Sequence, residues 1–289
     1  MKDKTYAIGL YEKAVPNELT WKAKLSAAKE AGYDFVEMSI DESDEKLARL
    51  DMSMDKRLEL VQTMFEAGIP IRSICLSGHR KYPMGSSASE IREKSMEIME
   101  KAIKLADDLG VRIIMLAGYD VYYEASTKET KKRFADNLKA AVHMAARNGV
   151  QLAFETMETE FMNTVRKSMK YVEEIGSPYL NVYPDSGNIT NAAVTYKEDV
   201  LKDLNTGEKH LAALHLKETR PGEFRDLMYG EGHVDFESMI HTAWNMGVRR
   251  YVTEFWYLGS EDWKKDLKFA YDSMTKYLEK EEQAECWSN

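Results

Sequence analysis

Four residues with metal-binding side chains each close a short, largely apolar run of the sequence. They are Glu155, Asp185, His215 and Glu254, at the ends of the runs VQLAFE, YLNVYPD, LAALH and YVTE. A buried parallel strand is apolar along its length and becomes polar where it leaves the core at its carboxyl end. Three carboxylates and one imidazole form a donor set that binds Zn²⁺, Mn²⁺, Co²⁺ or Mg²⁺. We therefore interpret the four residues as ligands of one divalent metal ion, whose identity the sequence leaves open.

A divalent ion can hold adjacent carbonyl and hydroxyl oxygens of a sugar and stabilise the enediolate left when the neighbouring carbon loses its proton. Glu155 and Glu254 belong to predicted strands five and eight, so we expect them on opposite sides of the ion. One carboxylate would remove the proton and the other would return one to the opposite face, which inverts the carbon. Hydrolysis, dehydration and an aldose–ketose shift remain alternatives, because spacing alone does not separate these reactions.

An alternation of strands and helices must position these residues. Apolar runs of strand length alternate with segments of helical periodicity, and many of those segments end at a glycine, as at Gly32, Gly68 and Gly110. The strands are predicted at 6–11, 35–40, 71–76, 111–116, 152–155, 180–183, 211–216 and 251–255. The helices are predicted at 20–31, 54–67, 90–109, 129–147, 162–175, 198–204, 236–246 and 262–279.

Eight strand–helix units predict an α/β fold, a TIM (β/α)8 barrel of parallel strands. Because the carboxyl ends of barrel strands meet on one face, the last residues of strands five to eight should converge there. An open doubly wound sheet is the alternative, although the first turn has no G-x-G-x-x-G nucleotide fingerprint. No linker interrupts the pattern, so we expect residues 1–289 to form a single domain. The terminal QAECWSN is predicted to be frayed.

The composition indicates in which cellular compartment the protein works and which classes of partner it binds. A net charge of −9 argues against nucleic acid as a partner. Cys75 lies in an apolar run and Cys286 in a polar tail, which indicates no disulfide framework. The amino terminus lacks the apolar core of a signal peptide, and no apolar run is long enough to span a membrane. We therefore expect a cytoplasmic protein with no membrane partner.

Basic, glycine-rich and aromatic residues follow the predicted strands that surround the proposed metal site. The basic and glycine residues are Lys217, Arg220, Arg225, Gly230 and Gly232 after strand seven, and His79 and Arg80 after strand three. Loops of this kind bind phosphate in many barrels, so in an acidic chain they indicate an anionic substrate, with ordinary solvated charges as the alternative. Tyr119, Tyr122 and Tyr123 after strand four, and Trp256 after strand eight, are placed to wall a sugar pocket.

Longer stretches carry a resemblance to a known family. The most specific are FVEMSIDESDEKLARLD from Phe35 and CLSGHRKYPMGS from Cys75. The others are GLYEKAVP, LAGYDVYY, YPDSGN, HLKETRPGEF and GEGHVDFE. With these stretches the chain resembles, over nearly its whole length, the L-ribulose-5-phosphate 3-epimerases of bacterial L-ascorbate utilisation, which are xylose isomerase-like TIM barrels.

The resemblance implies a metal-dependent 3-epimerase that interconverts L-xylulose 5-phosphate and L-ribulose 5-phosphate, and a homodimer is expected for this fold family. It implies the same four metal ligands, with Glu155 and Glu254 as the acid/base pair. Related epimerases of free ketoses carry a histidine three residues after the metal-binding aspartate, where this chain has Asn188. We expect this departure to favour a phosphorylated ketopentose, with Asn188 among the substrate-binding residues.

Other members of the same fold remain alternatives. Hydroxypyruvate isomerases, inosose dehydratases and aldose–ketose isomerases use a similar donor set. Endonuclease IV-like enzymes need more histidine ligands and a basic groove, which six histidines and an acidic chain disfavour. A sugar-phosphate-binding barrel without chemistry is disfavoured by the intact pair of glutamates.

Overall fold

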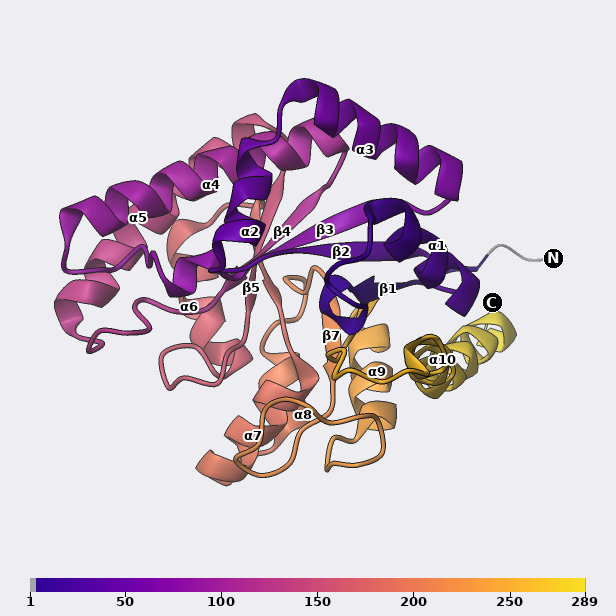
Figure 1. Cartoon of the computed structure of the whole chain (residues 1–289). Helices are drawn as coiled ribbons and strands as arrows, with labels where there is room; N and C mark the ends of the chain where they lie inside the picture. The colour runs from indigo at the N-terminus through magenta and orange to yellow at the C-terminus, as the bar shows by residue number, and fades with distance from the viewer. Residues whose placement is uncertain (1–3, 289) are drawn as a thin grey trace.

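Eight parallel strands form a barrel with helices on its outer side (Figure 1). The computed structural model describes the backbone of residues 4–288 and the side chains of residues 4–285. The strand order is β6-β5-β4-β3-β2-β1-β8-β7. Two isolated parallel bridges, Val182–Leu211 and Asp185–His215, join the edge strands β6 and β7. The barrel is therefore nearly closed, which confirms the predicted fold.

The strands agree closely with those predicted from the sequence. They are β1 Ala7–Tyr11, β2 Phe35–Ile40, β3 Ile71–Leu76, β4 Ile113–Ala117, β5 Gln151–Glu155, β6 Leu180–Tyr183, β7 Leu214–Lys217 and β8 Arg250–Glu254. The helices are α1 Trp21–Ala31, α2 Asp44–Leu47, α3 Met54–Ala67, α4 Ser89–Leu109, α5 Lys128–Arg147, α6 Val165–Ile175, α7 Ser186–Tyr196, α8 Val200–Asn205, α9 Phe236–Asn245 and α10 Trp263–Ser288. Short 3₁₀ helices are η1 Glu12–Ala14, η2 Ala48–Asp51 and η3 Ser77–Arg80.

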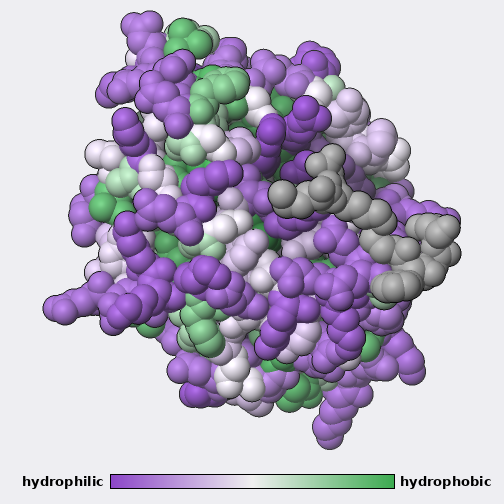
Figure 2. Space-filling model, turned by 90° about the vertical axis from the view of Figure 1, so that its right-hand side faces the viewer, coloured by the Kyte–Doolittle hydropathy of each residue, from purple (hydrophilic) through white to green (hydrophobic). Residues whose placement is uncertain are grey.

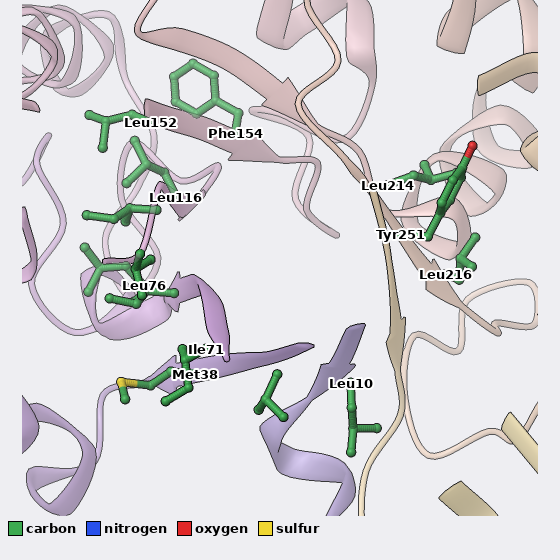
Figure 3. Close-up of a cluster of buried hydrophobic side chains, with 14 of the residues drawn as sticks. Leu10, Met38, Ile71, Leu76, Leu116, Leu152, Phe154, Leu214, Leu216 and Tyr251 are labelled. Atoms are coloured by element: carbon green, nitrogen blue, oxygen red, sulfur yellow. The ribbon is translucent and has the colours of Figure 1, made fainter. Parts of the chain in front are cut away.

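Alternate residues of the strands supply two hydrophobic layers, because successive side chains point to opposite faces of a strand. Leu10, Met38, Leu116 and Phe154 belong to the larger layer, between the strands and the helices (Figure 3). The smaller layer fills the barrel with Tyr11, Phe35, Cys75, Met115, Ala153, Tyr183 and Val252, among others. Cys75 is a free, buried cysteine, whereas the side chain of Cys286 lies outside the described residues.

The structure differs from the predicted elements at α7 and at the carboxyl-terminal tail. The helix predicted at 198–204 corresponds to α8, but α7 was not predicted, because its sequence SGNITNAAVTY is rich in glycine, asparagine and β-branched residues that favour helix weakly. Tertiary packing overrides this preference, since the first half of α7 is buried. The tail predicted to fray continues α10 as far as Ser288, and Asn289 lies outside the described residues.

One face of the molecule is mainly polar. The face drawn in Figure 2 is largely hydrophilic, with separate hydrophobic patches between the charged side chains. Within residues 4–288, no helix is long and apolar enough to cross a membrane.

Candidate metal centre

The structure brings the four predicted metal ligands together at the carboxyl ends of the strands. Glu155 ends β5, His215 lies in β7 and Glu254 ends β8, while Asp185 lies just beyond β6 and caps α7. Their ligand atoms all lie within 4.8 Å of one another, and all four side chains are buried. Parallel register explains the convergence, because Asp185 is bridged to His215 and Lys217 pairs with Glu254.

The donor set fits a divalent cation. Asp185 Oδ1 accepts a hydrogen bond from the backbone N–H of Asn188 at 2.6 Å. Asp185 Oδ2 is buried and has no donor group as a partner among the described residues. Three buried carboxylates packed around one imidazole carry negative charge that burial makes costly unless a cation compensates it. Oxygen and nitrogen donors of this kind suit Zn²⁺, Mn²⁺, Co²⁺ or Mg²⁺.

The three carboxyl groups of the cluster have different pKa values, because the charges around each of them differ. Burial and the neighbouring Glu254 carboxylate raise the pKa of Glu155 to about 8. Burial likewise raises the pKa of Asp185 to about 7, although Lys217 opposes this shift. Burial acts in the same direction on Glu254, but Lys217 and His215 hold the pKa of that carboxyl well below its usual range. Without a metal ion, Glu254 is therefore the most acidic of the three carboxyl groups.

Glu37 is a functional residue that the sequence reasoning missed. Its Oε1 atom lies 2.6 Å from His215 Nε2, and its Oε2 atom accepts a hydrogen bond from Ser73 Oγ at 2.6 Å. With Nε2 engaged by Glu37, the other ring nitrogen, Nδ1, faces the cluster and lies 2.6 Å from Glu254 Oε2. Carboxylates commonly orient metal-binding histidines in this way. The available signal was a charged residue inside the otherwise uncharged strand FVEMSI.

Lys217 is a buried cation beside the carboxylates. Its Nζ atom donates to Asn188 Oδ1 at 2.9 Å and lies 3.2 Å from Asp185 Oδ1. Burial opposes the charge, but Asp185, Glu254 and Glu155 raise the pKa of Lys217 above its usual value. The positive charge of Lys217 therefore balances part of the negative charge of the three carboxyl groups.

A small cavity adjoins the cluster. Of the predicted substrate-binding residues, it is lined by Arg80, Asn188, Lys217, Arg225 and Trp256. It is also lined by Glu155 and Glu254, and by residues that the sequence reasoning did not select: Tyr11, Lys13, Cys75, Ser77, Met157, Glu158 and Phe224. The cavity therefore combines the two glutamates with basic groups and aromatic walls.

Four predicted substrate-binding residues are not among those that line the cavity. His79 is buried within η3, where Nε2 lies 3.1 Å from Ser95 O, and burial lowers its pKa to about 4. Arg220 is half exposed and donates to the Glu231 carbonyl at 2.8 Å. These two side chains are thus engaged by the scaffold.

The glycines of the β7–α9 loop fold that loop around the buried Glu218. The Gly230 N–H donates to Glu218 Oε2 at 3.0 Å, so it is already occupied. A Cβ atom at Gly232 would lie 2.1 Å from the Thr219 carbonyl oxygen, so the close approach of the two backbones requires glycine there. The predicted backbone anion site is therefore not formed at Gly230, because a side chain of the same loop takes its donor.

Aromatic residues contact two of the basic side chains that line the cavity. The Arg80 guanidinium lies 4.7 Å from the Tyr122 ring centroid and donates to Tyr119 Oη at 3.3 Å. The Arg225 guanidinium lies 5.7 Å from the Trp256 ring centroid. Tyr123, in contrast, is exposed and donates to Glu42. Of the predicted aromatic wall, Trp256 lines the cavity, whereas Tyr119, Tyr122 and Tyr123 are not among the residues that line it.

Comparison with known proteins agrees with this fold and site. Residues 25–273 match the family model of the xylose isomerase-like TIM barrels. The L-ribulose-5-phosphate 3-epimerase UlaE of Escherichia coli O139:H28 is 44% identical over 263 residues, which is 91% of each chain. The protein of the same name from Escherichia fergusonii is 43% identical over the same shares. A solved L-ribulose 3-epimerase superposes with a TM-score of 0.78 at 19% identity and covers 98% of both chains.

The chain therefore belongs to the xylose isomerase-like TIM barrels and, within them, to the L-ribulose-5-phosphate 3-epimerase family. This membership confirms the resemblance found in the sequence.

Proposed function

We propose that the protein is a metal-dependent 3-epimerase that interconverts L-xylulose 5-phosphate and L-ribulose 5-phosphate. The observation that carries the proposal is the pair Glu155 and Glu254, which line one cavity and belong to one cluster of possible metal ligands. The name and 44% identity of the relatives support the choice of substrate. Glu155, Asp185, His215 and Glu254 would hold the ion, which when bound supplies Lewis-acid stabilisation of negative charge on the sugar oxygens.

The two glutamates then perform the proton transfers. One carboxylate takes the C3 proton, the electron pair of the C–H bond forms the C2–C3 double bond, and charge passes to the C2 oxygen. The other carboxyl returns a proton to the opposite face of C3, and the carbonyl re-forms. An acid and a base must be present at the same time, and the two glutamates that line one cavity can supply both.

Basic residues of the cavity support a phosphorylated substrate. Arg80 and Arg225 line the cavity, and Arg80 Nε is buried without a partner among the described residues. Lys13 adds a further cation there, although Asp41 pairs with it at 2.6 Å. A phosphate group in the cavity would pair with the Arg80 guanidinium, because planar guanidinium groups match phosphate oxygens well.

The test is an incubation of the metal-loaded protein with L-xylulose 5-phosphate in heavy water, followed by NMR. We expect L-ribulose 5-phosphate with deuterium at C3. Deuterium at C1 together with an aldose product would instead assign the protein to the aldose–ketose isomerases. The absence of any exchange with full metal occupancy would overturn the proposed substrate.

A further inference from the structure

We infer that Lys217 is a catalytic residue that donates a hydrogen bond to the oxygen that becomes negative when the C3 proton is removed, and that Asn188 positions it. This inference rests on the proposed function and goes beyond the two glutamates and the metal ligands. It assigns Lys217 to the reacting end of the substrate, whereas the sequence alone grouped it with the basic loop residues expected to bind an anion.

The strand places Lys217 beside the reacting groups. His215 and Lys217 are two residues apart in β7, so their side chains lie on the same face of the strand. That face carries His215 into the cluster, and Lys217 follows it to the cavity, where it is 4% exposed. Lys217 is also the residue of β7 that pairs with Glu254.

The backbone at Lys217 is fixed against the start of α7. The Lys217 N–H donates to Ser186 Oγ at 3.0 Å, and the Ser186 hydroxyl donates to the Lys217 carbonyl at 3.2 Å. Gly187 permits this close packing, because a Cβ atom there would lie 2.9 Å from the Lys217 carbonyl oxygen and 2.4 Å from Thr219 Cγ2. The Lys217 side chain is therefore attached to a backbone position that is held in place, as electrostatic catalysis requires.

Asn188 fixes the other end of the side chain. Its Nδ2 atom donates to the Thr156 carbonyl at 2.7 Å, which turns Oδ1 toward Lys217 Nζ at 2.9 Å. Nζ also lies 3.2 Å from Asp185 Oδ1. An ammonium group has three N–H donors. Asn188 and Asp185 account for two of them, and the third is available to a molecule in the cavity that Lys217 lines.

A donor held in this way acts on developing charge. Removal of the C3 proton moves an electron pair toward the C2 oxygen, and the Lys217 N–H stabilises that oxygen without transferring its proton. Loss of one such donor typically lowers turnover by about 10²–10³-fold. The contribution appears mainly in turnover, because the hydrogen bond strengthens as the charge develops.

The test compares Lys217→Met with the wild type. We expect turnover to fall about a hundredfold. The affinity for a four-carbon phosphohydroxamate whose nitrogen takes the place of C3, a planar mimic of the 2,3-enediolate, should fall by a similar factor. Affinity for a pentitol 5-phosphate, which lacks the carbonyl, should change by less than about threefold. Lys217→Arg should recover part of the loss, and Asn188→Ala should reproduce part of it.

Two controls separate this role from a structural one. Mn²⁺ affinity, measured by calorimetry, should not fall in Lys217→Met, because the Asn188 backbone N–H still holds Asp185 and a positive charge next to the ligands has been removed. Lys13→Met, which removes another lysine of the same cavity, should change the affinities for the hydroxamate and the pentitol phosphate equally. Equal loss of both affinities in Lys217→Met, or a parallel loss of Mn²⁺ affinity, would overturn the inference.

The wild type distinguishes failure of the inference from failure of the proposed function. If the wild type exchanges the C3 proton and Lys217→Met does so at the same rate, only the role of Lys217 is wrong. If the wild type exchanges no proton at C3, the proposed epimerase itself is wrong.

Discussion

His215 Nε2 and Glu37 Oε1 lie 2.6 Å apart inside the barrel, although the two residues are 178 positions apart in the sequence. The Glu37 carboxylate accepts the Nε2 N–H and orients the ring, as carboxylates commonly do for metal-binding histidines. It leaves Nδ1 for the cluster, where Glu254 Oε2 lies at 2.6 Å. Glu37 is itself fixed by Ser73, so a chain of polar groups runs through the barrel interior to the candidate metal centre.

Replacement of Glu37 should therefore weaken metal binding. We expect Glu37→Gln to lower the affinity for Mn²⁺ or Zn²⁺ by about tenfold or more, because loss of the carboxylate relaxes both the orientation and the tautomer of His215. Calorimetric titration of the metal-free protein measures this change. Ser73→Ala, which only removes the support of Glu37, is the matched control and should have a smaller effect. An unchanged affinity in Glu37→Gln would contradict the positioning role.

Variants of the two glutamates proposed as the acid/base pair should lose activity in different ways when each is replaced alone. In heavy water, Glu155→Gln and Glu254→Gln should each lose interconversion by at least about 10²-fold. Each variant should still exchange the C3 proton of one pentulose phosphate for deuterium, because each keeps the carboxylate on one face of C3. The two variants should therefore label different epimers. Metal occupancy is checked in the same samples. Labelling of both epimers by one variant would show that a single base serves both faces.

Without the metal ion, the free energy of unfolding should fall as the pH rises. Without an ion, the pKa values of Glu155 and Asp185 are about 8 and about 7, above their ordinary values of 4.5 and 3.8. Between the ordinary and the raised pKa values, the folded state binds more protons than the unfolded state. The contribution of these two groups to the free energy of unfolding is therefore largest below about pH 4 and is lost as the pH rises through 7 to 8. Urea unfolding of EDTA-treated and metal-loaded protein from pH 5 to 8.5 measures this. We expect the decline in the metal-free sample alone.

A second buried charge cluster predicts the opposite pH dependence. Glu12 is 1% exposed and contacts Lys24 at 2.8 Å, Lys46 at 2.7 Å and Arg49. Burial alone would raise the pKa of Glu12, but Arg49, Lys24 and Lys46 hold it well below its ordinary value of 4.5. This contribution to stability is present above about pH 4.5 and is lost as the pH falls below it.

The matching variant is Glu12→Gln. Because it leaves buried cations without their partner, we expect a loss of about 3–5 kcal/mol in the free energy of unfolding at pH 7. The difference from the wild type should shrink below about pH 4.5, where the Glu12 carboxylate of the unfolded wild-type chain gains a proton while the folded one stays ionised. Chemical denaturation at both pH values measures it. A difference that stays constant with pH would show that packing, and not charge, stabilises this cluster.

The sequence by itself determined the barrel and the four clustered residues. Strand and helix periodicities are local properties, and eight repeats of them leave few ways to pack. Parallel strands end on one face, so Glu155, Asp185, His215 and Glu254 had to meet once their strands were recognised. A polar residue that follows an apolar run is visible without any knowledge of its neighbours.

Tertiary structure alone decided which other polar groups serve the site. His79 and Gly230 resemble ligands in the sequence, but Ser95 and Glu218 occupy them. Glu37 lies inside a strand, and only closure of the barrel brings it to His215. The helix α7 forms because burial outweighs its weak local preference, and its first turn then holds Asn188 against Lys217. The physical reason is the same in each case: a hydrogen-bonding group's partner depends on distances across the fold, which no local pattern in the chain encodes.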